Sequence, residues 1–304
     1  MVQTRRFKNV SWIDMKHPTA DEVREVMQLY KIHPLAAEEL LIPTPEPKVD
    51  TYADCIYLVL HFPTHTWTST EKTDEIDFII GKDYVVTARY SAVDALHGFS
   101  KIFEMNETIN KDKIEATNAG TVFYWMMRSI YQSLGAKIQS AKNVLMEIEE
   151  DIFAGKEREM VSEISKLSRE LLAFKHTIAL HGKVLTAFHS AALKFFGEGY
   201  GYELNLIQNE YDHIQQLAGG YLESLARMRD TNDSLLHTKE NAIMQRLTVI
   251  IFITSIISIF LSLFAIGAVS RPVIDSPYDF WILTVVIIVI GIASYLYFKT
   301  KKWL

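Results

Sequence analysis

Two long apolar runs near the C-terminal end dominate the hydropathy pattern of the chain. Leu247 to Val269 contains 23 residues without a charge, and Phe280 to Phe298 contains another 19. A helix of about 18 or more uncharged apolar residues is long enough to cross a bilayer. The pattern therefore predicts a two-helix transmembrane hairpin, 247–269 and 280–298, within a C-terminal segment 247–304 that ends in a basic tail.

The first 112 residues are more polar and predict a mixed α and β domain. Thr19 followed by Glu22 is a capping-box pattern that opens a helix towards Tyr30. Pro34 at a first helical position predicts a second, short helix that ends before Pro43.

Stretches rich in β-branched and aromatic residues predict strands at 51–62, 75–80 and 84–88. Gly81-Lys82-Asp83 is the expected hairpin turn between the last two, and a small sheet covered by helices follows as the expected fold of 1–112. Asp74, Glu75 and Asp77 form an acidic cluster that we interpret as a solvated strand end.

Residues 113–246 have the pattern of a helical stalk, since apolar residues recur every three or four positions without a proline. The pattern predicts helices at 121–153 and 157–196 around an Ala154-Gly155 turn, and a Gly-rich turn at 197–201. From this turn one continuous helix of about 65 residues, roughly 100 Å long, runs into the first apolar segment. A helix of this length cannot bury one stripe against a small domain alone, so we expect it to pack against copies of itself.

A polar stripe with strict heptad spacing runs along the first predicted membrane helix, which is the repeat of a left-handed helix bundle. It consists of Asn241, Met244, Thr248, Ile251, Ser255, Ser258 and Ser262. One reading is that small polar residues let membrane helices approach closely. Polar residues at five of seven positions favour instead the wall of a hydrated cation pathway. A single hairpin cannot enclose a pore, so several copies must contribute this face.

Charge and motifs exclude several other classes of function. The net charge of −6 lacks the basic excess expected of a nucleic-acid-binding protein. The single cysteine, Cys55, lies in an apolar run and is expected to be a buried strand thiol. His61 and His65 are separated by Pro63, which argues against a zinc site on a helix. The sequence contains no nucleophile elbow, Walker loop or redox pair, so we expect neither an enzyme nor a bound cofactor.

Basic residues beside the apolar runs predict the orientation in the membrane. Lys239 and Arg246 precede the first run, and the tail 299–302 follows the second, whereas the connecting loop has one basic residue, Arg271. Because basic residues are enriched on the cytoplasmic side, both termini are expected to be cytoplasmic in a multi-pass protein of the inner or plasma membrane.

Several stretches are distinctive in their order along the chain. They are WIDMKHPTADE, IHPLAAEELL followed by PKVDTYADCIYLVLHF, YDHI, NAIMQRLT before the first apolar run, and the terminal YFKTKKWL. From about Ser11 to the C-terminus the chain thereby resembles the CorA family of divalent-cation channels. The resemblance implies a homopentamer with a funnel of α/β cytoplasmic domains and first membrane helices around a central pore. It also implies magnesium, cobalt or nickel as the ions.

The outer end of the first membrane helix departs from this family, whose signature there is a Gly-Met-Asn triplet. Alignment without a gap from Asn241 places the family's Tyr-Gly-Met-Asn on residues 264–267, and a shift of two residues keeps only the glycine. Neither alignment supplies the asparagine, so selectivity is expected to be altered. The predicted outer mouth consists of Gly267, Ala268, Val269, Asp275 and Asp279.

The resemblance also implies a regulatory metal site between subunits. In the family, the last acid of the IHPL motif pairs with an acid three residues before the Asp-His of the long helix. These positions map to Glu39 and to Asn209, with Glu210 and Asp212 beside the latter. One charge fewer should weaken binding of a hard cation. The alternative is that Glu39 is simply a solvated helix residue.

These observations predict an α+β cytoplasmic domain, a long-helix stalk and a C-terminal two-helix transmembrane hairpin in a CorA-like homopentamer. The expected function is movement of divalent cations through the pentameric pore. Two alternatives stay open, namely a proton-coupled zinc transporter of the same family and a membrane-anchored structural or regulatory protein that does not conduct.

Overall fold

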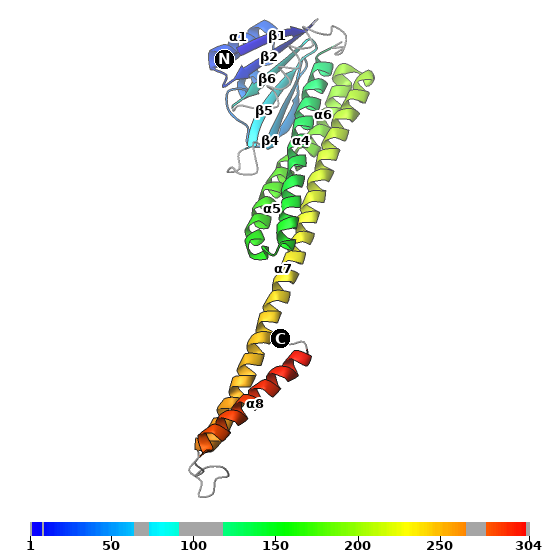
Figure 1. Cartoon of the computed structure of the whole chain (residues 1–304). Helices are drawn as coiled ribbons and strands as arrows, with labels where there is room; N and C mark the ends of the chain where they lie inside the picture. The colour runs from blue at the N-terminus through cyan, green and yellow to red at the C-terminus, as the bar shows by residue number, and fades with distance from the viewer. Residues whose placement is uncertain (1, 8, 64–72, 91–117, 266–277, 302–304) are drawn as a thin grey trace. The chain divides into compact units, whose positions relative to one another are not determined.

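The computed structural model describes residues 2–7, 9–63, 73–90, 118–265 and 278–301. The chain divides into two compact units, Met1–Arg229 and Asp230–Leu304, which we call the α/β unit and the helical unit. The α/β unit combines a sheet with helices, and the helical unit holds the two apolar runs (Figure 1).

A six-stranded sheet is the framework of the α/β unit. In chain order its strands are β1 (Val2–Phe7), β2 (Val10–Lys16), β3 (Lys48–Thr51), β4 (Ile56–Pro63), β5 (Thr73–Ile80) and β6 (Tyr84–Arg89). In space the order is β1-β2-β6-β5-β4-β3, and β2 and β6 form the one parallel pair. Strands β1 and β2 were not predicted from the sequence, although β2 is an interior strand that pairs with both β1 and β6.

The predicted strands 75–80 and 84–88 are confirmed as β5 and β6. The turn between them is also confirmed, since Gly81 N donates to Tyr84 O at 2.9 Å. The strand predicted at 51–62 is confirmed from Ile56 onward as β4, but its predicted start is wrong, because Thr51 ends a separate strand, β3. A tight turn joins them, in which Tyr52 N donates to Cys55 O at 2.9 Å. Side-chain composition alone does not reveal such a turn, because the residues on both sides of it favour strand.

Helices α1 (Ala20–Tyr30) and α2 (Pro34–Glu39) cover one face of the sheet. The predicted capping box is confirmed, because the Thr19 hydroxyl accepts from Glu22 N and the Glu22 carboxylate accepts from Thr19 N. Alternate strand residues meet these helices in one core. Its buried members include Ile13, Met15, Val23, Val26, Ile32, Ala36, Ala37, Leu40, Cys55, Tyr57, Val59, Ile79, Val86 and Ala88.

Three further helices, α4 (Ala119–Phe153), α5 (Glu157–Ala179) and α6 (His181–Phe196), contact the sheet in the α/β unit (Figure 1). The Phe123 ring of α4 lies 5.3 Å from Phe78 of β5 and 4.9 Å from Phe188 of α6. Apolar ring contacts thus connect a strand with two helices that are distant in sequence.

The helical stretch predicted at 157–196 is confirmed in its extent, but it is divided at Leu180 into two helices, α5 and α6. The next residue, His181, is fully buried, and its ring is hydrogen-bonded to Tyr131 and to the His61 carbonyl. These contacts anchor the chain to α4 and β4 at the break. Both predicted turns are confirmed, with φ of 92° at Gly155 and 90° at Gly197.

A continuous helix of 65 residues, α7 (Gly201–Ala265), confirms the predicted long helix, and α8 (Asp279–Thr300) follows it. In the part of the chain that the structure describes, one helix is long and apolar enough to cross a membrane, judged by length and composition. The apolar stretch Thr284–Thr300 of α8 is shorter. Residues 266–277 of the predicted connecting loop lie outside the described residues.

Candidate ion pathway and regulatory sites

All seven residues of the predicted polar stripe lie on α7, and each of them is exposed in the single chain. Even its apolar members are open, with Met244 58% and Ile251 55% exposed. The heptad pattern therefore finds no covering partner among the residues that the structure describes. A regular stripe with no intrachain partner needs water, lipid or another copy to cover it.

The opposite side of the same segment is less exposed. Five apolar residues there are buried or half-buried, namely Val249, Ile253, Ile256, Ile257 and Phe260. At 3.6 residues per turn they lie roughly 150° around the helix from the centre of the stripe. The Phe252 and Phe298 rings meet edge to face at 5.6 Å, which joins α7 to α8. Within the helical unit, α7 thus uses one side for intrachain packing and leaves the stripe free.

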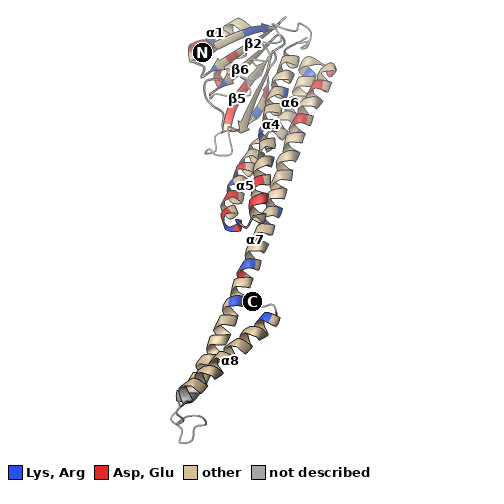
Figure 2. Ribbon diagram, in the orientation of Figure 1, with Lys and Arg blue, Asp and Glu red and all other residues tan. Residues whose placement is uncertain are grey.

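The stripe can offer acceptor oxygens without carrying charge. The Thr248 hydroxyl donates to Met244 O at 2.7 Å, which uses its proton inside the helix. The hydroxyl oxygen keeps its capacity to accept a hydrogen bond from water. Charged residues are absent from Leu247 to Ala265, as Figure 2 shows, so this wall would be neutral. Neutral oxygens suit a cation that keeps its hydration shell.

The predicted outer mouth falls mostly beyond the described residues. Gly267, Ala268, Val269 and Asp275 lie outside them, and Asp279 is the first residue of α8.

The predicted regulatory acid Glu39 already has a cationic partner in its own chain. Its carboxylate lies 2.7 Å from Lys48 Nζ, and Asp50 lies 3.4 Å from the same ammonium. The Lys48 ammonium also stands over the Tyr57 ring, 5.4 Å from its centre. Lys48 was not among the predicted site residues, although it directly follows Pro47 at the start of β3. A metal ion at Glu39 would have to compete with this ammonium.

The long-helix partners of this predicted site also have local contacts. Glu210 lies 3.9 Å from Arg128 of α4, and Asp212 accepts a hydrogen bond from Gln208 at 3.1 Å, while Asn209 is exposed. The described residues contain no group of three or more His, Cys, Asp or Glu side chains placed to hold a metal. A site that used Glu39 and Asn209 would therefore take further ligands from a second copy.

The acidic cluster of β5 is not the solvated strand end that its sequence indicated. Asp74, Glu75 and Asp77 are buried, with exposed fractions of 7%, 8% and 0%. Glu75 and Asp77 alternate with Ile76 and Phe78, so they share a face with the core residue Ile79. The alternation of Glu75 and Asp77 with the apolar Ile76 and Phe78 was the signal that the sequence contained.

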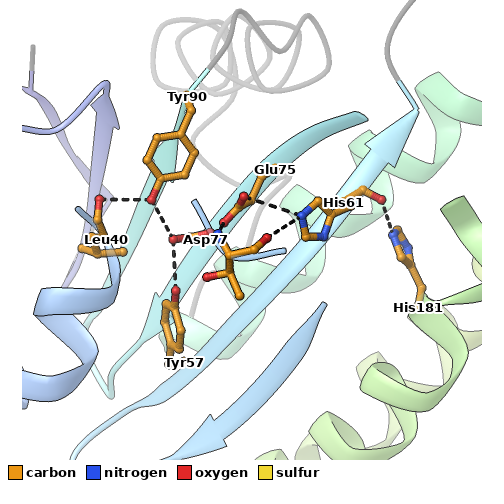
Figure 3. Close-up of polar contacts among 8 residues, drawn as sticks. Leu40, Tyr57, His61, Glu75, Asp77, Tyr90 and His181 are labelled. Carbon is orange, nitrogen blue, oxygen red and sulfur yellow. Dashed lines mark hydrogen bonds and ion pairs between the residues drawn. The ribbon is translucent and has the colours of Figure 1, made fainter. Parts of the chain in front are cut away.

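A chain of hydrogen bonds surrounds these acids, as Figure 3 shows. Asp77 Oδ2 lies 3.1 Å from the hydroxyls of both Tyr57 and Tyr90. Glu75 Oε1 accepts from Thr44 N at 2.7 Å, and Glu75 Oε2 lies 3.5 Å from His61 Nε2. Burial and the neighbouring Glu75 charge raise the pKa of Asp77 to about 8. The raised pKa favours the protonated form of this buried carboxyl group near neutral pH.

His181 extends the polar contacts to the helices on the other face. Its Nε2 lies 2.7 Å from the His61 carbonyl, which can only accept, so Nε2 carries a proton. Its Nδ1 lies 2.9 Å from the Tyr131 hydroxyl and accepts from it. Both ring nitrogens are satisfied in the neutral form, and burial lowers the pKa of His181 to about 4.

Another buried acid, Asp14 of β2, lies beside a guanidinium group rather than beside another acid. Arg89 Nη2 lies 2.7 Å from Asp14 Oδ2, and the Thr87 hydroxyl donates to Asp14 Oδ1 at 2.9 Å. Trp12 Nε1 in turn donates to the Thr87 hydroxyl at 3.0 Å. The ion pair and these hydrogen bonds fix the Asp14 side chain between β2 and β6.

A family model described as CorA-like Mg2+ transporter protein matches residues 7–301 of the chain. The chain therefore belongs to the CorA-like Mg2+ transporter family, which consists of membrane transporters and not of enzymes. This confirms the family resemblance found in the sequence.

The chain is 22% identical to the cobalt/magnesium transport protein CorA of Thermotoga maritima over 300 residues, which is 97% of this chain and 83% of that protein. The solved CorA magnesium transporter of Methanocaldococcus jannaschii is similar in fold, with a TM-score of 0.83 and 19% identity over 99% of this chain and 94% of that one. The ZntB cytoplasmic domain of Vibrio parahaemolyticus has a TM-score of 0.59 and 12% identity over 78% of this chain and 90% of that one. These similarities confirm the predicted CorA-like fold.

Proposed function

We propose that the chain assembles into a homopentamer that moves divalent cations across a membrane along the polar stripe of α7. The observation that carries this proposal is the exposure of all seven stripe residues on the side of α7 away from its intrachain packing. Family membership supports transport of divalent cations as the class of function. Magnesium or a transition metal, such as cobalt, nickel or zinc, is the proposed cargo.

The proposed location is the inner or plasma membrane. The proposed topology places both termini in the cytoplasm. In this division of the chain, residues 1–112 form the cytoplasmic α/β domain, 113–246 the helical stalk and 247–304 the transmembrane hairpin. Basic residues beside both apolar runs support this orientation. A native mass of five chains in detergent and cytoplasmic labelling of the C-terminus are the expected results, and a monomer would contradict the assembly.

Ion flux into proteoliposomes tests the proposed transport directly. Vesicles that contain the purified full-length protein should take up magnesium, cobalt, nickel or zinc faster than vesicles without it. This uptake should not require a proton gradient. Flux of zinc that requires a proton gradient would favour the alternative of a proton-coupled zinc transporter. Absence of flux for every ion and gradient, with the pentamer intact, would favour the alternative of a structural or regulatory protein.

The outer mouth is proposed to gather cations by charge. Asp275 and Asp279 offer two carboxylates per chain near the end of the pathway, where the sequence has no Gly-Met-Asn triplet. A charged mouth raises local cation concentration without coordinating the ion, so we expect weak discrimination among divalent ions. Its benefit should fall as ionic strength rises past about 0.15 M, where the screening length is about 8 Å. Replacement of both residues by Asn should lower flux at low salt and remove its salt dependence, and unchanged flux would contradict this role.

A further inference from the structure

The buried acids Glu75 and Asp77 lie among groups that can be counted donor by donor. Asp77 Oδ2 has two hydroxyl neighbours, Tyr57 and Tyr90, each at 3.1 Å. Among the described residues, the buried Asp77 Oδ1 has no hydrogen-bond partner, and the Asp77 carboxyl group interacts with the neighbouring Glu75 side chain. An ionised Asp77 would leave Oδ1 unsatisfied beside a second carboxylate. A proton held between the two carboxyl groups removes one of the two charges and supplies the missing donor.

Tyr90 has two acceptors and one proton. Its hydroxyl lies 3.0 Å from the Leu40 carbonyl, at the C-terminal end of α2, and 3.1 Å from Asp77 Oδ2. A hydroxyl donates a single hydrogen bond, so it serves only one of these acceptors at a time. Hydrogen bonds to a charged acceptor are roughly twice as strong as those between neutral groups. Ionisation of Asp77 should therefore draw the Tyr90 proton away from Leu40.

The donor count balances in one protonation state only. With one proton on the acid pair, the Asp77 proton bonds Glu75, Tyr57 bonds Asp77, and Tyr90 bonds the Leu40 carbonyl. Without that proton, one donor is missing, and either the Leu40 carbonyl or an Asp77 oxygen is left without a hydrogen bond. A buried acceptor that loses its donor is destabilised by about 1–3 kcal/mol.

We propose that Glu75 and Asp77 share one proton inside the sheet, and that loss of this proton moves the Tyr90 hydrogen bond from Leu40 to Asp77 and loosens the end of α2. The pair is thus a proton-binding site, with α2 as the element that responds. This proposal is based on contacts within the α/β unit and does not depend on the proposed ion pathway.

Other charged and titratable groups around the pair, among the described residues, do not replace this proton. From β4, His61 contributes Nε2, which lies 2.9 Å from the Thr44 carbonyl and therefore already donates there. The Lys48 ammonium of β3 is already paired with Asp50 of the same strand and with Glu39 of α2. The hydroxyls of Tyr57 and Tyr90 stay protonated, because burial, followed by the charge of Asp77, raises the pKa of each.

Hydrogen–deuterium exchange of the full-length protein in detergent tests the response of α2. Exchange of the peptide over 34–42 should be measured from pH 6.5 to 9.5 and corrected for the intrinsic rate at each pH. Protection should fall several-fold above a midpoint near pH 8, the pKa of Asp77. Asp77→Asn retains a donor towards Glu75, so it should keep α2 protected at every pH. Constant protection in the wild type would overturn the proposal.

Two further variants keep the test decisive if Asp77→Asn does not fold. Glu75→Gln removes the neighbouring charge and should move the midpoint to lower pH, whereas Tyr90→Phe should lower protection at every pH and abolish the transition. Asp50→Asn changes an acid that is 46% exposed on the neighbouring strand β3, and it should leave the transition in place. A midpoint unaffected by Glu75→Gln would overturn the shared proton, and a transition retained in Tyr90→Phe would overturn the role of Tyr90.

Infrared spectra provide a readout of the proton itself. Between pH 6.5 and 9.5 the wild type should lose the carbonyl band of one protonated carboxyl group per chain. Asp77→Asn should lack this change, and Asp50→Asn should retain it. Loss of the band with the same midpoint in Asp77→Asn would assign the proton elsewhere and overturn the proposal.

Discussion

The two units of the chain satisfy their polar residues in different ways. In the α/β unit, Asp14, Asp77 and His181 are buried, and their hydrogen-bond partners come from the same chain. In the helical unit, the polar residues of the α7 stripe are exposed and lie away from the side that packs within the chain. Polar residues therefore specify the fold of one chain in the first unit. In the second unit they gain a role only with water, lipid or other copies.

The largest effect that this comparison predicts is loss of the Asp14–Arg89 ion pair. Asp14→Ala leaves the guanidinium without its partner in a mostly buried place, which should cost about 3 kcal/mol of stability. Thermal unfolding of the full-length protein in detergent measures the loss. Asp21→Ala breaks the exposed Asp21–Arg24 pair and should cost less than about 1 kcal/mol. Equal losses of stability would contradict the conclusion that burial determines how much each ion pair contributes to stability.

Two buried groups of the α/β unit should give opposite dependences of stability on pH. The raised pKa of Asp77 means that its contribution to stability is lost as pH rises from about 4 to about 8. The lowered pKa of His181 means that its contribution is lost as pH falls from about 6.5 to about 4. Between pH 4.5 and 6.5 the two slopes should largely cancel in the wild type.

A variant that removes one of the two titrating groups should reveal the pH dependence of stability that the other group causes. Towards pH 4.5, Asp77→Asn should become less stable by up to about 3 kcal/mol, and His181→Gln should become more stable by a similar amount. Melting temperatures in detergent at matched ionic strength provide the measurement. His213→Gln changes an exposed histidine of α7 and serves as the control. Parallel slopes in the two variants would refute the opposed assignment.

A smaller effect is expected on the exposed stripe, where flux should change and stability should not. Ser258→Leu should dry the pathway and lower ion flux about tenfold, equivalent to about 1.4 kcal/mol, with the assembly intact. Thr254→Leu lies off the stripe, where the Thr254 hydroxyl donates to Ile251 O at 2.9 Å, and should matter less. Equal losses of flux at both positions would favour helix packing as the role of the stripe.

The smallest expected effect concerns magnesium at the predicted site between copies. Asn209→Asp restores an acid at an exposed position of α7 and should increase protection from protease by magnesium by a few fold. Lys48→Gln should sharpen the same effect, because it removes the ammonium that Glu39 now binds. If neither substitution changes the protection, Glu39 and Asn209 have no part in magnesium binding.

Features set by neighbouring residues in sequence could be predicted, and those set by distant contacts could not. The capping box at Thr19, the turn at Gly155 and the continuous helix α7 follow from local patterns and are confirmed. The break at Leu180 depends on contacts of His181 with Tyr131 and the His61 carbonyl, which are 50 and 120 residues away in sequence. No local pattern contains that information.

The features of the candidate sites also divide into those predictable from local sequence and those that depend on distant contacts. The spacing of the stripe could be read directly because it repeats along one helix. The burial of Asp77 could not, because it depends on Tyr57 from β4 and Tyr90 after β6. Glu39 could be found from a motif, but its ion pair with Lys48 bridges a turn and needed the fold. The stripe residues, the mouth residues and the magnesium site stay predictions.

The strand order of the sheet imposes an order of assembly during synthesis. Strands β1 and β2 form one antiparallel block, and β3, β4 and β5 form another, while β6 lies between them and is made last. Until Tyr84 to Arg89 leave the ribosome, β2 and β5 each present an unpaired edge, and Asp14 has no guanidinium, since its partner lies 75 residues downstream. Open edges of this kind favour pairing with other chains. The nascent chain is therefore most vulnerable to aggregation just before the arrival of β6 joins the two blocks.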